Sequence, residues 1–134
     1  MPVEGLFSTT VEVLSKSVDL RTRQQNLIAS NIANAETPGY VPKSLDFEEQ
    51  LQFAAKAGKV RKHNASDSGK SPNPGHIPLR GEMVDNIRRV RGRVVNTPAK
   101  TPGRDENAVE IENEMSRMMQ NQVLFNASVQ LLAK

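Results

Sequence analysis

The residues of this chain that could do chemistry are few, and they gather in its middle. Both histidines, His63 and His76, fall in segments rich in glycine and proline. Asp67 follows His63 by four residues, a spacing that brings side chains together only on a helix, and no third ligand lies nearby. No nucleophile elbow accompanies them. We therefore expect no catalytic residue, no metal and no cofactor.

A second short motif suggests phosphate binding but lacks its context. Residues 67–71 read Asp-Ser-Gly-Lys-Ser, like the second half of a phosphate-binding loop. The first glycine of that motif would fall at Asn64, and no apolar strand precedes it. The chain also has no cysteine, which excludes thiol enzymes, disulfide scaffolds and cysteine zinc sites. The sequence thus favours a protein that is not an enzyme.

Two groups of basic residues are a stronger candidate for binding. They are Lys59, Arg61 and Lys62, then Arg88, Arg89, Arg91 and Arg93. Such runs attract phosphate backbones, so a small basic helical protein associated with nucleic acid is the alternative reading. No aromatic residue interleaves with them, and no helix-turn-helix or zinc-finger pattern surrounds them. A solvated basic surface, or one facing an acidic neighbour, is therefore favoured over nucleic-acid binding.

The elements that must carry these residues differ sharply along the chain. The 134 residues suffice for one domain, and only five are aromatic, so the core is thin. Residues 56–104 hold twelve basic and three acidic residues, whereas both flanking segments are net acidic. No apolar run is long enough to span a membrane or to form a secretory signal, so we expect no direct membrane insertion.

The N-terminal segment, residues 1–38, is predicted to be a long helix. Its apolar residues recur every seven positions and form one broad stripe. One row is Leu6, Val13, Leu20 and Leu27, and Ile32 belongs to a second. The helix should end before Pro38-Gly39, because the residue before a proline is pushed out of the helical region.

The C-terminal segment, residues 109–134, has a similar pattern. Its residues step alternately by four and three through Ile111, Met115, Met118, Gln122, Phe125, Val129 and Leu132. This spacing is typical of a coiled-coil seam. We therefore predict a mainly α fold in which long N- and C-terminal helices pair as a coiled-coil hairpin.

The middle of the chain should pack outside that hairpin. Residues 39–57 are predicted to be a turn and a short helix, the helix lying around 44–57. Residues 58–108 form an irregular basic region in which 58–81 read as loop. Within it, a short helix over 82–91 and a strand over 93–96 are both compatible with the pattern.

Two helices cannot shelter both faces of such broad stripes. Either the third helix completes a self-contained bundle, or apolar surface remains for other copies of the protein. The periodicity by itself supports a self-contained bundle and an assembly subunit about equally. Under the second, side chains such as Leu20 and Met118 stay partly uncovered until other subunits cover them.

The end of the N-terminal helix carries a distinctive run. Residues 31–40 read Asn-Ile-Ala-Asn-Ala-Glu-Thr-Pro-Gly-Tyr. Asn31 and Asn34 can cap carbonyls or bond to a neighbouring helix, and Tyr40 can bury its ring while its hydroxyl stays hydrogen-bonded. Thr37, Pro38 and Gly39 supply the turn.

With Leu27-Ile28-Ala29-Ser30 before it, this run closely resembles the N-terminal signature of bacterial flagellar axial proteins, and in particular the flagellar basal-body rod family. Residues 41–47, 76–78, 109–115 and 121–127 resemble further stretches of that family.

The resemblance implies a structural subunit of the flagellar basal-body rod that assembles helically through its terminal helices and transmits torque. It implies export to the periplasm through the flagellar type III apparatus, without a cleaved signal peptide. The implied partners are other copies of the chain, neighbouring rod proteins, and the ring or export-gate end of the basal body, with no nucleic acid. The apolar seam residues named above would then form the assembly interface.

Overall fold

The computed structural model describes residues 3–60, 80–98 and 108–134, and within them the side chains of 9–56, 84–98 and 108–134. The described elements, in chain order, are α1 (Val3–Ala33), β1 (Lys43–Asp46), α2 (Glu48–Val60), α3 (Arg80–Arg89), β2 (Arg93–Asn96) and α4 (Ile111–Leu132). The prediction of a mainly helical chain with long terminal helices is confirmed.

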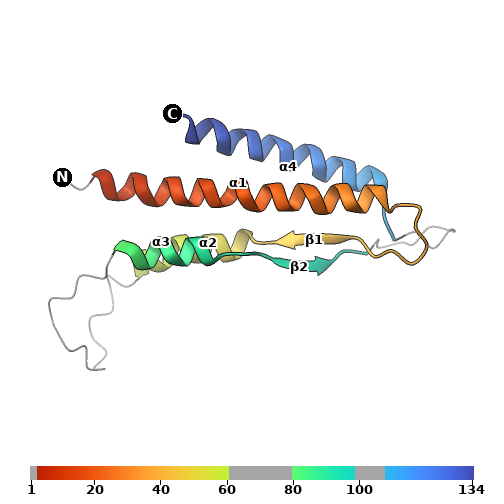
Figure 1. The fold of residues 1–134 in the computed structure, drawn as a ribbon, viewed down its shortest axis with the longest axis horizontal. Helices are drawn as coiled ribbons and strands as arrows, with labels where there is room; N and C mark the ends of the chain where they lie inside the picture. The colour runs from red at the N-terminus through yellow and green to blue at the C-terminus, as the bar shows by residue number, and fades with distance from the viewer. Residues whose placement is uncertain (1–2, 61–79, 99–107) are drawn as a thin grey trace, which may run out of the picture.

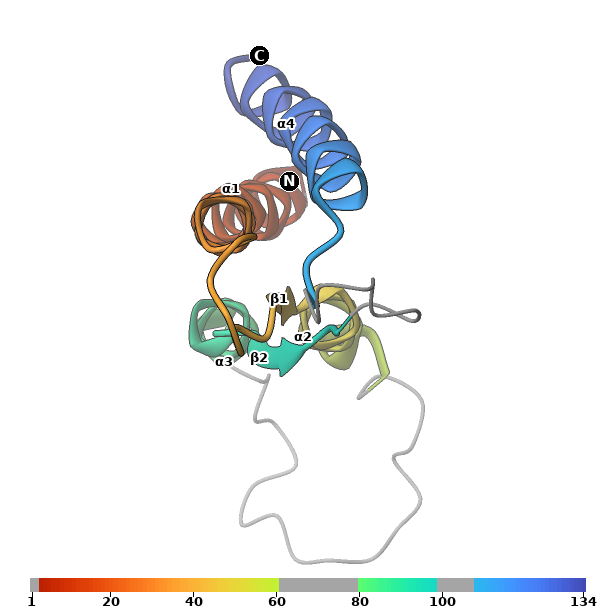
Figure 2. The same ribbon diagram turned by 90° about the vertical axis from the view of Figure 1, so that its right-hand side faces the viewer.

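The elements stack in three layers around α1 (Figure 1). α4 runs antiparallel to α1 on one side, and the β1–β2 pair with α2 and α3 covers the other side. Viewed along the helices, α4 and α2 flank one side of the molecule, while α1 and α3 lie on the other (Figure 2). The described elements of the middle, β1, α2, α3 and β2, therefore pack outside the helical hairpin, as predicted.

The end of α1 follows from its sequence. The helix ends at Ala33, four residues before the Thr37-Pro38 pair, and Gly39 then takes a positive φ of 74°. Glycine adopts this conformation without a steric penalty, because it has no Cβ. The side-chain Nδ2 atom of Asn34 donates to the Ser30 carbonyl over 2.8 Å, and the same carbonyl accepts the backbone N–H of Asn34 over 3.1 Å.

The middle segment is more regular than the sequence indicated. The short helix over 82–91 and the strand over 93–96, which the pattern allowed, are present as α3 at residues 80–89 and β2 at residues 93–96. The helix predicted around 44–57 is instead a strand followed by α2, because Lys43–Asp46 pairs antiparallel with Arg93–Asn96. The predicted loop 58–81 is helical at both ends, and residues 61–79 lie outside the described part of the chain.

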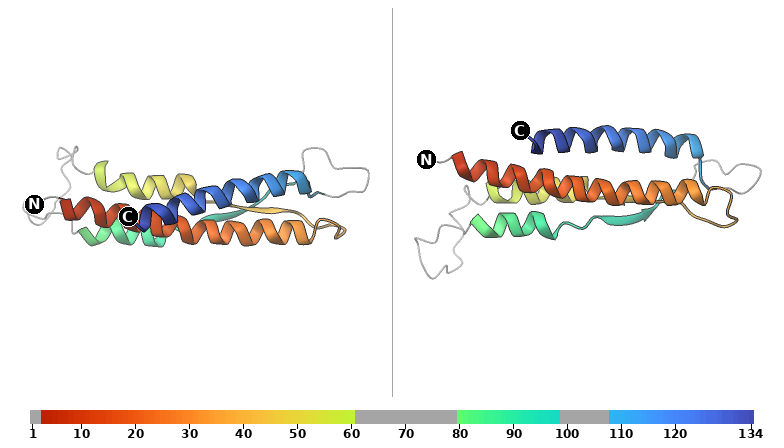
Figure 3. Two further views of the ribbon diagram at one scale, coloured as in Figure 1. Left: turned by 90° about the horizontal axis from the view of Figure 1, so that it is seen from above. Right: turned by 45° about the horizontal axis from the view of Figure 1, so that its top comes forward.

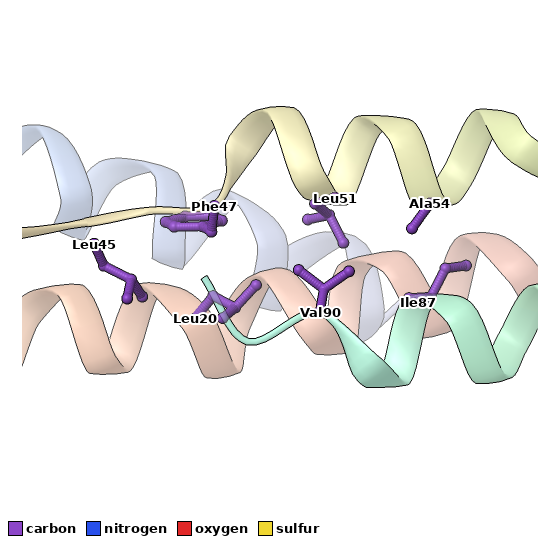
Figure 4. Packing of buried hydrophobic residues seen from close by; sticks show 7 residues of the cluster. All are labelled: Leu20, Leu45, Phe47, Leu51, Ala54, Ile87 and Val90. Carbon is purple, nitrogen blue, oxygen red and sulfur yellow. The ribbon is translucent and has the colours of Figure 1, made fainter. Parts of the chain in front are cut away.

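The core lies between α1 and the layer of α2, α3 and β1. Its buried cluster is Leu20, Leu45, Phe47, Leu51, Ala54, Ile87 and Val90 (Figure 4). Val13 and Leu27 are partly buried against it, so three members of the row predicted on α1 face this core. Leu20 is fully buried within the single chain, which contradicts the expectation that it stays partly exposed until another subunit covers it. The reason is that α2, α3 and β1 cover the face of α1 opposite α4.

Candidate assembly interface

The contact between α1 and α4 is built around a buried polar pair. The Nδ2 atom of Asn31 donates to Oε2 of Glu114 over 2.9 Å, and both side chains are almost completely buried. The other carboxylate oxygen of Glu114 accepts a 3.2 Å bond from Arg117. This network fixes the position of the first turns of α4 along α1, because an unpaired buried carboxylate would be costly.

A second polar contact lies one heptad further along α4. The Nδ2 atom of Asn121 donates to the Arg21 carbonyl over 3.0 Å and to Oε1 of Gln25 over 2.8 Å. Ser128, a further heptad along, is also buried and bonds to the carbonyl of Leu124 in its own helix. The buried residues of α4 are thus Glu114, Asn121 and Ser128, all polar and each seven positions apart.

The predicted seam of α4 is therefore partly wrong. Met118, Phe125 and Leu132 are half-buried, beside the polar row, as expected of a seam. Ile111, Met115, Gln122 and Val129 are exposed instead. The helix is turned by roughly 50° from the predicted orientation, counting 3.6 residues per turn. The turn places Glu114 and Asn121 against their hydrogen-bond partners on α1 and leaves apolar residues outside.

Two of these exposed residues, Ile111 and Met115, begin a continuous row along the outer surface of the helix, which we call the α4 ridge. Its members are four positions apart, and all are apolar and exposed: Ile111, Met115, Met119, Val123, Ala127 and Leu131. Met119 and Val123 are 72% and 66% exposed. Residues four apart line up as a ridge on a helix surface, the unit that packs into the grooves of another helix. The described part of the chain does not cover this ridge.

The predicted motif of residues 31–40 forms a second hydrogen-bonded unit around Asn31. The Oδ1 atom of Asn31 accepts from the Tyr40 hydroxyl over 3.1 Å and from the Lys43 backbone N–H over 2.9 Å. Its Nδ2 atom donates to the Lys43 carbonyl over 2.8 Å as well as to Glu114. Tyr40 is half-buried and its hydroxyl is paired, as predicted. Asn31 therefore joins α1, β1 and α4 at one point.

The remaining motif residues shape the turn. The backbone N–H of Thr37 donates to the Asn34 carbonyl over 2.9 Å, and the Tyr40 N–H donates to the Thr37 carbonyl over 3.2 Å. Pro38 and Gly39 are exposed within this turn. Their part is to direct Tyr40 back toward Asn31, so the motif positions the buried contact.

The sequence did not single out several residues that matter here. Gln24 lies one heptad before Asn31, and its Oε1 accepts a bond from the Leu45 backbone N–H. Apolar periodicity does not find Glu114 and Asn121, because both side chains are polar. The signal that finds them is a polar row at the same seven-residue spacing as the apolar one.

A cleft of about 500 Å³ opens beside the α1–α4 contact, between α4 and the β1–α2 segment. The Arg21 guanidinium lies over the Phe47 ring at 5.5 Å. One of its nitrogens lies 3.4 Å from a Glu48 carboxylate oxygen, and its Nε has no hydrogen-bond partner. The acidic residues Asp46, Glu48 and Glu49 also line the cleft, as does Leu124 of α4.

The basic residues of the second group are partly neutralised within the chain. Arg88 makes two bonds to the Glu12 carboxylate, at 2.6 and 3.2 Å, and this hydrogen bonding holds the pKa of Glu12 below its ordinary value. Arg93 lies 3.5 Å from Asp46 across the strand pair.

The first basic group, Lys59, Arg61 and Lys62, lies in or beside the undescribed segment. His63, His76 and residues 67–71 also lie outside the described residues, as does the side chain of Leu6.

Within the described residues, no three His, Cys, Asp or Glu side chains are grouped to hold a metal ion. Among the described helices, none is both long and apolar enough to cross a bilayer. The one buried carboxylate named above, that of Glu114, is bonded to Asn31 and Arg117.

Comparison with known proteins agrees with this picture. The model of the family described as "Flagella basal body rod protein" matches residues 20–40, the segment that contains Arg21, Asn31 and Tyr40. The flagellar basal body rod protein FlgB of Proteus mirabilis is 30% identical over 127 residues, which cover 95% of this chain and 85% of that protein. The chain belongs to the FlgB family of flagellar basal body rod proteins.

Other members of the FlgB family match nearly as far. The FlgB protein of Cereibacter sphaeroides is 29% identical over 94% of this chain and 87% of its own length. That of Escherichia coli K12 is 25% identical over 88% of this chain and 80% of its own length. Membership of a rod family makes the chain a structural protein rather than an enzyme, and no finding favours the nucleic-acid alternative.

Proposed function

We propose that this chain is a structural subunit of the bacterial flagellar rod that joins the assembly by packing the α4 ridge against helices of neighbouring subunits. The exposure of this ridge is the observation that carries the proposal. Contiguous exposed apolar surface of this kind marks an interaction site on a soluble protein. A helix that is held inward by polar contacts and is apolar outward suits a subunit whose apolar partner is another chain.

The proposed mechanism is mechanical. Each subunit would be stiffened by the buried contacts of Asn31 and Asn121, which fix α4 on α1. Packing the ridges of successive subunits into one tube would then transmit torque, because close-packed side chains resist shear. The partners would be other copies of this chain, neighbouring rod proteins, and the ring or export-gate end of the basal body.

We further propose that the subunit works in the periplasmic part of the basal body and reaches it through the flagellar type III apparatus, without loss of a signal peptide. This rests on membership of the rod family. The intact mass of the protein recovered from purified basal bodies tests it. A mass that includes the N-terminal segment is expected, and a shortened N-terminus would contradict it.

The assembly proposal is tested by placing a charge on the ridge. Met119→Glu should abolish or strongly reduce both incorporation into purified basal bodies and swimming in soft agar, in cells whose own gene is deleted. Asn113→Glu adds the same charge at an exposed polar position of α4 and should leave both intact. Circular dichroism of the two purified variants should show equal helicity. Normal incorporation of Met119→Glu would refute the role of the ridge.

A further inference from the structure

The two long sides of the molecule carry opposite charge. One side, which we call the arginine flank, consists of α1, α3 and the segment just after α3; its exposed arginines are Arg23 on α1, Arg88 and Arg89 on α3, and Arg91 in that segment. The other, the cleft flank, consists of α4, α2 and the cleft between them, with Asp46, Glu48 and Glu49 at the cleft. The end-on view places α1 with α3 on one side and the first turns of α4 with α2 on the other (Figure 2), and seen from above α4 crosses over α1 toward its C-terminus (Figure 3).

The arginine flank retains positive charge that the chain itself does not neutralise. Arg88 is paired with Glu12, and Arg23 donates to the Arg91 carbonyl. Arg89 and Arg91 are exposed, and neither has an acidic partner within the described residues. Their guanidinium groups are therefore available to carboxylates of another molecule.

The cleft flank retains carboxylate capacity in the same way. Glu49 is exposed and has no partner in the described part of the chain. Glu48 is 66% exposed, and its bond to Arg21 is long, at 3.4 Å. The cations nearest the cleft are already engaged, since Arg117 is bonded to Glu114 and Arg21 lies against Phe47. The rim therefore presents acidic groups that can accept further hydrogen bonds from guanidinium groups.

We propose that the cleft flank of one subunit receives the arginine flank of a second copy of this chain, with Arg89 and Arg91 pairing at the carboxylates of Glu48 and Glu49. The proposal rests on the proposed function and names a lateral contact within that assembly. The complementary charges occur on the same chain, which is why the occupant is a second copy. A two-fold dimer through either flank would bring like charges together.

The placement of the flanks also fixes the kind of assembly. The contact joins two different surfaces on opposite sides of each subunit, so it is heterologous. Each added copy leaves one free flank of each kind, and repetition gives a ring or an open helix instead of a closed dimer. Exposed Leu124 on the cleft flank adds apolar area to the same contact.

Charge reversal tests this geometry. Sedimentation of the purified full chain at low salt measures self-association of the variants Glu49→Lys and Arg89→Glu. Each variant alone should associate roughly fivefold more weakly than the unaltered chain, because one favourable pair becomes a like-charge pair. An equimolar mixture of the two should recover most of the loss, since each contact then joins opposite charges. A chain that carries both substitutions should associate about as strongly as the unaltered chain, because each of its contacts again joins opposite charges.

The controls separate this contact from general charge effects and from the ridge. Glu36→Lys and Lys43→Glu change the same net charges at exposed positions that are not among the cleft-lining residues or the arginines of the proposed contact, and should leave association unchanged. A mixture that associates no better than the single variants, or an equal effect of Glu36→Lys, would overturn the proposal. The proposal would also be overturned if the arginine flank bound only anionic vesicles or another rod protein, and not a second copy of this chain.

The same measurement distinguishes failure of the proposed function. If Met119→Glu leaves association unchanged while the charge swap behaves as expected, the ridge is not the interface and the lateral contact stands. If Met119→Glu weakens association and the charge swap does not, only the lateral contact fails. No association of the unaltered chain at millimolar concentration would overturn the lateral contact directly.

Discussion

Asn31 and Glu114 lie 83 positions apart in the chain, yet their side chains meet through a 2.9 Å hydrogen bond in a site closed to solvent. The same asparagine bonds to both backbone groups of Lys43 and to the Tyr40 hydroxyl. All four hydrogen-bonding positions of its amide are therefore occupied. One side chain thus connects the motif, the strand pair and the C-terminal helix.

Replacing that side chain should be costly. Asn31→Ala leaves Glu114 and the Lys43 N–H without their buried partner, so the free energy of unfolding should fall by about 2–4 kcal/mol. Asn34→Ala removes two exposed bonds at the helix end, one to the Ser30 carbonyl and one from the Thr37 hydroxyl, and should cost about 1 kcal/mol or less. Urea denaturation followed by circular dichroism compares the two variants. Equal decreases in the free energy of unfolding would contradict the role of Asn31 in joining α1, β1 and α4.

Gly92 should tolerate no side chain. Its φ is 70°, and an added Cβ would lie 2.9 Å from Cγ of Leu45 and 3.1 Å from Cβ of Phe47. Gly92→Ala should therefore destabilise the folded protein by more than the roughly 1–2 kcal/mol that alanine costs in the left-handed backbone conformation. Gly39→Ala is the matched control, because its φ is 74° but no atom lies within 4 Å of the added Cβ. Thermal melting should place Gly92→Ala well below Gly39→Ala, and the reverse order would contradict the packing around Leu45.

Leu20 should behave as a core residue of the single subunit. Leu20→Ala removes a fully buried side chain between α1 and the layer of α2 and α3, and should cost about 2–5 kcal/mol. Val11→Ala, at a half-exposed position of the same helix, should cost much less. Both are measured on dilute protein, where no neighbour contributes. A small effect of Leu20→Ala would indicate that the core forms only on assembly.

The Glu12–Arg88 pair should make stability depend on pH in acid. The hydrogen bond from Arg88 lowers the pKa of Glu12 in the folded protein below its ordinary value of 4.5, and the nearby positive charge adds to this. The contribution of the Glu12–Arg88 pair to stability is therefore fully present above the ordinary pKa of 4.5 and is lost as pH falls through the lowered pKa of the folded protein. The pKa of Arg88 is raised, so this group stays charged throughout.

Arg88→Gln should consequently be less stable than the unaltered chain at neutral pH, and the difference should shrink as the pH falls below 4.5. Arg89→Gln, at the next position, is exposed and should show no such dependence. Urea unfolding at several pH values measures both. A difference that stays constant through acid would mean that Glu12 is not held by Arg88 in solution.

The sequence by itself determined the local structure. Seven-residue rows placed α1 and α4, Pro38-Gly39 ended the first helix near its observed end, and the short helix and strand of the middle were both compatible with the pattern. These features follow from propensity, periodicity and turn chemistry, which act between residues close in the chain. The motif of residues 31–40 also indicated the family.

Only the tertiary structure decided which faces are covered. It buried Leu20 beneath α2, α3 and β1, and it turned α4 so that Glu114 and Asn121 face α1 while Met115 and Met119 face outward. Apolar spacing could not predict this rotation, because the free energy of satisfying buried amides and a carboxylate rivals that of burying a few apolar side chains. The partners of these polar groups lie up to 100 positions away, and only folding brings them together.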